Sequence, residues 1–236
     1  MKRALCETGP MPTDPDPPYL YPDYVGTRLR SPKDPLAIIP HTLTELTGPA
    51  YGESALDPTD SDLTQQYPGE PHGQRIIVSG RVLGSDGRPL RGQLIEIWQA
   101  NAAGRYRHDV DTHDAPLDPN FGGAGRALTD DSGEYRFVTI EPGAYPWKNH
   151  YNGWRPRHIH LSLFGRDFTE RIVTQMYFPG DPLMDIDPIF QSIPDGAARK
   201  GVISSFDIEN TVPDWALAYR FDIVVGGRYA TALDND

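Results

Sequence analysis

The sequence predicts an all-β fold: a β-sandwich with long loops and an extended N-terminal arm. At least six short segments have the apolar patterns of strands. The chain of 236 residues contains 23 Gly and 24 Pro, which favours many turns and few long helices. Because no segment has a convincing helical period, a helical bundle is disfavoured, and one all-β domain suits the length.

We predict that residues 1–70 form the extended arm, which packs on the rest of the domain or on a partner chain. They are rich in Pro, Asp, Thr and Gly and have no sustained period of 3.6 or 2. Disorder is the alternative for this composition. Apolar side chains that can be buried favour a packed arm: Tyr19, Tyr21, Tyr24, Leu36, Ile38 and Ile39.

We predict that residues 71–236 form the β-sandwich domain. The segments RIIVSGRVL and GQLIEIWQA read as two strands joined by a Gly/Asp/Pro loop. In a later segment, Tyr135 and Phe137 alternate with Arg136 and Val138, the period of a half-buried strand. Further strands are expected at 157–165, 171–178, 203–208 and 217–225. In the last of these, one face carries Leu217, Tyr219, Phe221, Ile223 and Val225.

Charge and composition exclude several classes of partner. Lys and Arg number 22 against 33 Asp and Glu, a net charge of −11, so nucleic acid and anionic membranes would be repelled. No apolar run approaches the roughly 20 residues of a membrane span. The single cysteine, Cys6, rules out an intrachain disulfide and a Cys-rich metal site. With no export signal read at the N-terminus, we expect a cytoplasmic protein.

His158 and His160 are the first candidates for chemistry. Two positions apart in a strand, they leave the same face about 7 Å apart, while Ile159 and Leu161 enter the opposite layer. Two such imidazoles can converge on one metal, although an incidental pair on a polar face has the same pattern. The other histidines lie in loop-like sequence, and no carboxylate is spaced to complete a metal triad.

Tyrosines could supply the anionic ligands of such a metal. Tyr106 follows a strand end and Tyr145 begins a turn before the histidine strand, although ordinary core tyrosines fit both positions. Ionising a phenol of pKa near 10 costs about 4 kcal/mol at pH 7, so the cation must be strongly Lewis acidic. Ferric iron meets this need better than zinc or calcium. Two imidazoles, two phenolates and a hydroxide would leave Fe³⁺ neutral, which suits a partly buried site.

At this point the sequence resembles the intradiol ring-cleaving dioxygenases, and most closely their protocatechuate-cleaving branch. The resemblance covers nearly the whole chain. Its motifs are YPDY (21–24), RIIVSGRV (75–82), EIWQANAAGRYRH (96–108), APLDPNFGGAGR (115–126), GAYPWKNH (143–150), WRPRHIH (154–160), TQMYFPGDPL (174–183) and LAYRFDIV (217–224). It implies a sandwich of transthyretin-like architecture and cleavage of protocatechuate with O₂ to 3-carboxy-cis,cis-muconate, in the β-ketoadipate pathway of aromatic degradation.

The resemblance also implies residue roles. Ferric iron would be held by Tyr106, Tyr145, His158 and His160, with Tyr145 leaving the iron and acting as a base when substrate binds. Arg155 would lie beside the substrate ring and stabilise negative charge, and Gln175 would contact Arg155. The substrate pocket would be lined by Tyr24, Trp98 and Trp147 together with Arg155.

One position departs from the family pattern. Arg157 stands where a small residue is usual, and strand alternation directs it away from the ligands, toward the surface or a partner contact. The resemblance further implies a homologous α chain without the iron ligands, joined in αβ protomers that form a larger symmetric oligomer.

Two alternatives stay open on sequence. A catechol or hydroxyquinol dioxygenase would have the same ligands but usually a helical N-terminal segment, which the Pro-rich arm lacks. A non-enzymatic transthyretin-like binding module would explain GRVLGSDGRPLRGQLIEIW and LTDDSGEYRFVTIEPGAY, but not the Tyr106, Tyr145, His158 and His160 set.

Overall fold

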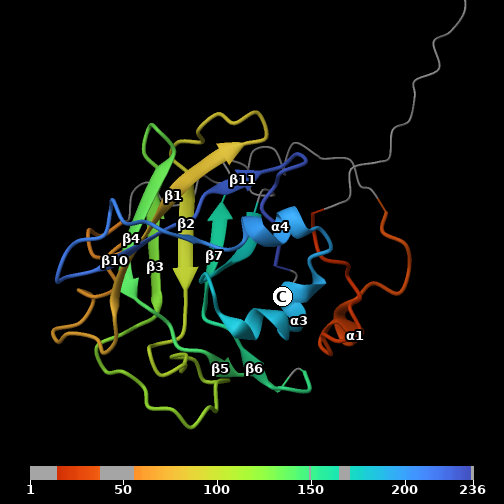
Figure 1. Ribbon diagram of the computed structural model, residues 1–236, viewed down its shortest axis with the longest axis horizontal. Helices are drawn as coiled ribbons and strands as arrows, with labels where there is room; N and C mark the ends of the chain where they lie inside the picture. Colours follow the sequence, from red (N-terminus) through yellow and green to blue (C-terminus); the bar gives the residue numbers. More distant parts are fainter. Residues whose placement is uncertain (1–14, 38–55, 149, 165–170, 235–236) are drawn as a thin grey trace, which may run out of the picture.

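The structure is a computed structural model that describes residues 15–37, 56–148, 150–164 and 171–234. Two β-sheets pack face to face around a single large core, and long loops with a few short helices surround them (Figure 1). The predicted all-β sandwich is confirmed. None of the described helices is long and apolar enough to cross a membrane.

The first sheet is built around strand β1 (Arg75–Gly84). On one side β1 pairs antiparallel with β4 (Glu134–Ile140). On the other side it pairs in parallel with β10 (Leu217–Arg220) and then with β11 (Ile223–Val225). The two-residue strand β9 (Ser205–Phe206) forms the edge beside β10. The last strand-forming part of the chain therefore completes the sheet around its first long strand.

The predicted continuous strand at 217–225 is corrected by a break at Phe221 and Asp222. The carbonyl of Phe221 accepts the Tyr135 hydroxyl at 2.6 Å, and the Asp222 carboxylate accepts the Arg81 amide at 2.8 Å. These bonds replace part of the ladder. Gly80 has no side chain because a Cβ there would lie 1.7 Å from the Phe221 oxygen. The predicted apolar face nevertheless packs in or against the core.

The second sheet has the order β3-β2-β7-β8, with every pair antiparallel. Its strands are β3 (Ala124–Leu128), β2 (Leu94–Trp98), β7 (His158–Phe164) and β8 (Arg171–Tyr177). Its inner face contributes to the core, with Ile95, Ile97, Ile159, Leu161, Leu163 and Met176 all buried. The neighbouring residues on these strands point to the outer face, where loops and helices cover them.

Short elements cover that outer face. A small hairpin pairs β5 (Tyr145–Pro146) with β6 (Trp154–Arg155). The helices within the described residues are α1 (Thr27–Arg30), the 3₁₀ helix η1 (Pro182–Asp185), α3 (Pro188–Ser192) and α4 (Gly196–Gly201). Asp181, Asp187 and Asp195 cap η1, α3 and α4 by accepting backbone amides of the first turn. Around these caps a second, smaller apolar cluster forms beneath α3 and α4.

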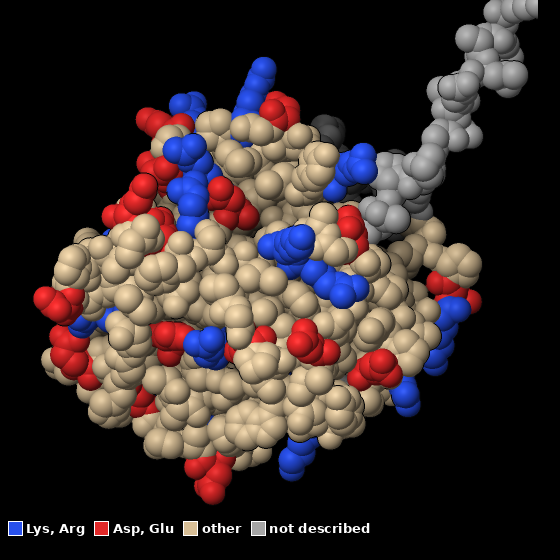
Figure 2. Space-filling model, viewed as in Figure 1, with Lys and Arg blue, Asp and Glu red and all other residues tan. Residues whose placement is uncertain are grey.

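The described parts of residues 1–70 lie against the sandwich. Asp16 accepts the Leu233 amide at 3.0 Å, and the Tyr24 ring packs edge-on against Trp147. Leu63 is fully buried in the core, and its amide donates to the Val138 carbonyl. The predicted arm boundary near residue 70 stays a prediction, and Ile38 and Ile39 lie outside the described residues. On the face seen in Figure 2, acidic and basic side chains are interspersed.

Candidate metal centre and active site

Strand β7 places His158 and His160 on the outer face of the second sheet. Their ring centroids are 4.9 Å apart, and both side chains are buried. Ile159 and Leu161 point into the core, as the period of two predicts. The two imidazoles therefore leave one strand face side by side beneath the covering loops.

The neighbouring strands hold these imidazoles in place. Trp98 on β2 lies opposite His160 in the register and stacks on its ring, with centroids 4.8 Å apart and planes 5° apart. On β8, Gln175 lies opposite His160 and Tyr177 lies opposite His158. Trp98 is thus a packing partner of a candidate ligand as well as a predicted pocket residue.

Two loops bring Tyr106 and Tyr145 to the same place. Asn101 organises the first loop, because its side chain accepts the amides of Ala103 and Arg105 at 3.0 and 2.9 Å. Gly104 (φ +76°) lies against the second loop, where an added Cβ would be 2.1 Å from the Ala144 oxygen. This close approach sets the Tyr106 and Tyr145 rings 5.1 Å apart, nearly perpendicular.

The four predicted ligands form a ring circuit, in which each aromatic ring lies beside two of the others. Besides the Tyr106–Tyr145 and His158–His160 contacts, the Tyr145 ring is 5.5 Å from His158 and the Tyr106 ring is 6.3 Å from His160, measured between centroids. Both tyrosine side chains are half-buried, and the Tyr106 hydroxyl oxygen is buried. Among the described residues, no group of three or more His, Cys, Asp and Glu could hold a metal. A metal at this place would need the tyrosines.

Hydrogen bonds define the tautomer of His158. Its Nδ1 atom lies 2.7 Å from the Pro156 carbonyl, an acceptor, so Nδ1 carries the proton. The Nε2 lone pair then makes a long 3.3 Å contact with the Arg155 guanidinium. Burial lowers the pKa of His158 well below its ordinary value, and Arg155 and His160 lower it further. His158 is therefore neutral with a lone pair on Nε2, the state that a metal ligand requires.

The neutral state of His158 predicts a pH dependence of the metal-free protein. An unfolded histidine has a pKa near 6.5, so below that pH the unfolded chain binds a proton that folded His158 does not. The free energy of unfolding should fall as pH drops below about 6.5, by up to about 1.4 kcal/mol per unit for this group. Urea titrations between pH 7.5 and 5 should give a shallower slope for His158→Asn.

Arg155 is the centre of a buried polar network. The side chain is fully buried, and its Nε and Nη2 atoms donate to the two carboxylate oxygens of Asp187 at 3.1 and 3.0 Å. Nη2 also donates to the oxygen of Gln175 at 2.7 Å, the contact that the resemblance implies, and to the Tyr177 hydroxyl. Burial alone would lower the pKa of Arg155, but Asp187 and the nearby tyrosines raise it well above its ordinary value.

Three further residues of this neighbourhood, Tyr177, Asp187 and Asp234, were not predicted from the sequence. Tyr177 carried a usable signal, because it shares a strand face with Gln175. Asp187 carried an ambiguous one, since an Asp-Pro pair marks the start of a helix as well as this site. Asp234 carried none. Burial alone would raise the pKa of Asp234, whereas His160, Gln175 and Arg155 bring it below its ordinary value.

The predicted pocket residues also gather here. Arg155 lies 5.6 Å from the centre of the Trp147 ring, and Trp147 in turn contacts Tyr24 with centroids 5.5 Å apart. Arg157 finds its partners within the chain, donating from Nε to Asp181 at 3.2 Å and from Nη1 to Glu141. These ion pairs account for the unusual arginine.

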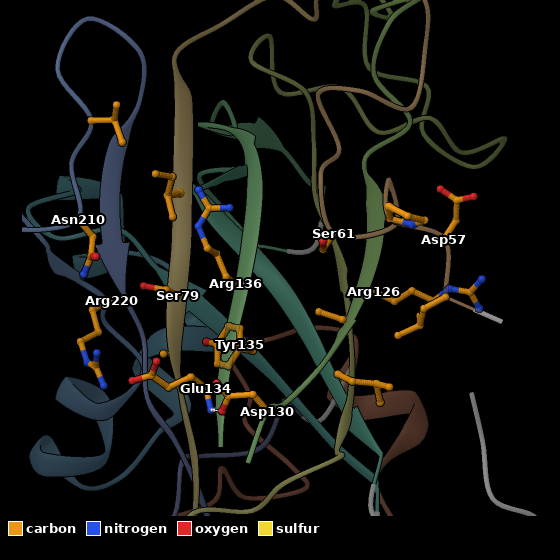
Figure 3. Close-up of a pocket in the computed structure, with 17 residues that line it drawn as sticks. Asp57, Ser61, Ser79, Arg126, Asp130, Glu134, Tyr135, Arg136, Asn210 and Arg220 are labelled. Carbon is orange, nitrogen blue, oxygen red and sulfur yellow. Dashed lines mark hydrogen bonds between the residues drawn. The ribbon is translucent and has the colours of Figure 1, made fainter. Parts of the chain in front are cut away.

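A large groove lies away from this centre. A groove of about 940 Å³ runs along the outer face of the first sheet, and none of the four candidate ligands lines it. Figure 3 shows Arg136 and Arg220 of this groove on β4 and β10, with Arg126 on β3. The candidate centre is defined by its side-chain chemistry and not by cavity size.

Comparison with known proteins identifies the family. Residues 46–227 match the family model described as "Dioxygenase", and residues 12–42 match "Protocatechuate 3,4-dioxygenase beta subunit N terminal". The protocatechuate 3,4-dioxygenase β chain of Burkholderia cepacia is 56% identical, over 93% of this chain and 94% of that one. This chain belongs to the protocatechuate 3,4-dioxygenase β-chain family of intradiol dioxygenases.

More distant similar proteins are also named as dioxygenases. The protocatechuate 3,4-dioxygenase α chain of Pseudomonas putida is 29% identical, over 84% of this chain and 98% of that one. The structure of catechol 1,2-dioxygenase from Acinetobacter sp. ADP1, inhibited by bound mercury, has a TM-score of 0.53 and 26% identity, covering 74% of this chain and 59% of that one. Intradiol dioxygenases generally depend on non-heme iron, and the paired chain names indicate an αβ assembly.

Proposed function

We propose that this chain is the iron-bearing β chain of an enzyme that opens the ring of protocatechuate between its two hydroxylated carbons. O₂ would be the second substrate and 3-carboxy-cis,cis-muconate the product, in the catabolism of aromatic compounds through the β-ketoadipate pathway. One observation carries the proposal: two histidines and two tyrosines form a closed ring circuit in a chain 56% identical to a protocatechuate 3,4-dioxygenase β chain.

The residues present fit a ferric ion. Tyr106, Tyr145, His158 and His160 would hold it, and the Nε2 lone pair of His158 supports this assignment. Two phenolates favour a trivalent, strongly Lewis-acidic cation over zinc or calcium. Bound there, ferric iron supplies the Lewis acidity that favours a doubly deprotonated catechol and makes its ring reactive toward O₂.

The chain's own residues would handle protons and charge. The phenolate oxygen of Tyr145 takes a proton from a catechol hydroxyl, while Tyr106 stays as the second tyrosine ligand. The guanidinium of Arg155 stabilises negative charge that develops on the substrate ring, because its planar cation is held beside the ligands by Asp187 and Gln175. Trp147 and Tyr24 form the aromatic wall next to Arg155 and exclude water.

The partner would be a homologous α chain, in αβ protomers that form a larger symmetric oligomer. Large apolar side chains of the N-terminal arm support this part of the proposal, since Tyr19, Leu29 and Leu36 are 56%, 92% and 63% exposed. The carboxylate of protocatechuate also needs a cationic contact, to which the partner chain would contribute.

The decisive experiment is spectroscopic. The chain co-expressed with its α partner and supplied with iron should show a red-brown phenolate-to-iron absorption band, which shifts on anaerobic addition of protocatechuate. On admission of O₂, protocatechuate should be consumed faster than catechol. The reverse preference would favour the catechol branch. A colourless, iron-free complex would favour a binding module.

Tyr145→Phe tests the base. The variant should keep iron through Tyr106, His158 and His160, and the onset of the protocatechuate-dependent spectral shift should slow, by about 10²-fold or more, because one proton acceptor is lost. Stopped-flow absorption under anaerobic conditions measures this rate. Tyr151→Phe is the matched control, because Tyr151 is 89% exposed. Equal binding rates in the Tyr145 variant and the parent would contradict the role.

A further inference from the structure

The C-terminal tail, residues 231–234, is fastened to strand β8. The Thr174 hydroxyl donates to the Ala232 carbonyl at 2.7 Å, and the Asp234 amide donates to the Val173 carbonyl at 2.7 Å. Ala232 is buried in the apolar cluster beneath α3 and α4. Figure 1 shows the last described segment of the chain close to these helices. The tail is thus part of the packed structure close to the ring circuit.

The tail places the Asp234 carboxylate next to the Nδ1 atom of His160. The Asp234 side chain is 2% exposed, and its Oδ2 atom accepts the Gln175 amide at 2.5 Å. The same oxygen lies 3.6 Å from Nδ1 of His160. Within the described residues, this buried Nδ1 has no partner at normal hydrogen-bond distance. The acid is therefore positioned where an imidazole N–H can reach it with a small rotation.

We propose that Asp234 is a positioning residue of the metal centre, which accepts the Nδ1 proton of His160 and so presents the Nε2 lone pair to the iron. The inference rests on the proposed function. A metal-bound histidine usually donates its other N–H to a carboxylate or carbonyl, which fixes the tautomer and strengthens the ligand. Here His158 has the Pro156 carbonyl in that role, and Asp234 would serve His160.

Two independent constraints then orient the His160 ring. Stacking on Trp98 fixes the plane of the imidazole, and the bond to Asp234 fixes its rotation within that plane. The N-terminal arm supports the second constraint, because Asp16 accepts the amide of Leu233, the residue before Asp234. Arm, tail and candidate ligand form one connected series of contacts.

Iron retention tests this role without measuring turnover. In the complete iron-loaded complex with the α chain, a strong ferric chelator is added and the loss of the phenolate-to-iron band is followed. Asp234→Ala should release iron about 10–100-fold faster than the parent, and Asp234→Asn should fall between the two. Asp234→Glu, which keeps the charge, should restore slow release. Asp131→Asn, at a 97% exposed carboxylate, should behave as the parent.

The outcomes separate the two claims. Parental release rates and an unshifted band in both the Ala and Asn variants would overturn the inference while leaving the proposed function intact. A parent complex with neither iron nor colour would overturn the proposed function and the inference with it. If Asp234→Ala does not fold, the Asn and Glu variants provide the comparison, with unfolding temperatures measured alongside to exclude a general loss of stability.

Discussion

Arg155→Ala will strongly slow ring cleavage and also lower the free energy of unfolding by about 3–5 kcal/mol. Arg155 and Asp187 are both fully buried, and the guanidinium binds the carboxylate in bidentate fashion. Removing the cation leaves an uncompensated charge inside the protein, which is far more costly than losing an exposed ion pair. Turnover should fall by about 10²–10³-fold or more, because the charge that we propose stabilises the substrate ring is gone.

A double variant separates the two effects. Arg155→Met combined with Asp187→Asn removes both charges, and the Asn keeps an acceptor for the Phe190 amide that Asp187 caps. Urea unfolding should show that the double variant recovers most of the lost stability, whereas oxygen uptake with protocatechuate stays as low as in Arg155→Ala. Parental stability in Arg155→Ala, or restored turnover in the double variant, would refute this account.

Gly104→Ala will produce the second large effect, on both stability and colour. Gly104 has φ +76°, a conformation that costs an alanine about 1–2 kcal/mol. Its new Cβ would also lie 2.1 Å from the Ala144 oxygen, so the loop that carries Tyr145 must move away from Tyr106. We expect a greater loss of stability than the conformational cost alone, with a weakened phenolate-to-iron band.

Gly87 offers a matched control. It has nearly the same φ, +77°, but an added Cβ would have no atom within 4 Å. Gly87→Ala should therefore lower the free energy of unfolding only by the conformational cost and keep the parental spectrum. Thermal unfolding and visible absorption of the two variants, measured side by side, isolate the effect of the loop contact. Identical stability losses and spectra would show that this contact does not position the tyrosines.

Much of the sandwich was predictable because local sequence pattern and tertiary burial coincide. The period of two in β7 correctly assigned Ile159 to the core and His158 to the opposite face. The break after β10 was not predictable, since it depends on a hydrogen bond between Tyr135 and Phe221, 86 positions apart. The alternation of apolar and polar residues within one segment does not reveal a hydrogen-bond partner so far away in the sequence.

The candidate site likewise contains residues that the sequence predicts and residues that it does not. Spacing alone pointed to His158 and His160, but only family resemblance distinguished Tyr106 and Tyr145 from ordinary core tyrosines. Neither approach predicted Asp234, because its side chain meets Gln175 from 59 positions away and no motif marks the sequence around it. Such a distant contact depends on the completed fold.

The parallel pairing of β1 has a consequence for how the protein is made. Arg81 and Asp222, which bond beside that pairing, are 141 positions apart, and ribosomes add about 5–20 residues per second. During synthesis, β1 therefore emerges on the order of ten seconds before its parallel partners. Until then the unpaired backbone N–H and C=O groups along one edge of β1 are open to other chains, and such distant pairings form slowly. Because the exposed edge persists for as long as these later residues are being made, chaperone supply during synthesis should raise the soluble yield.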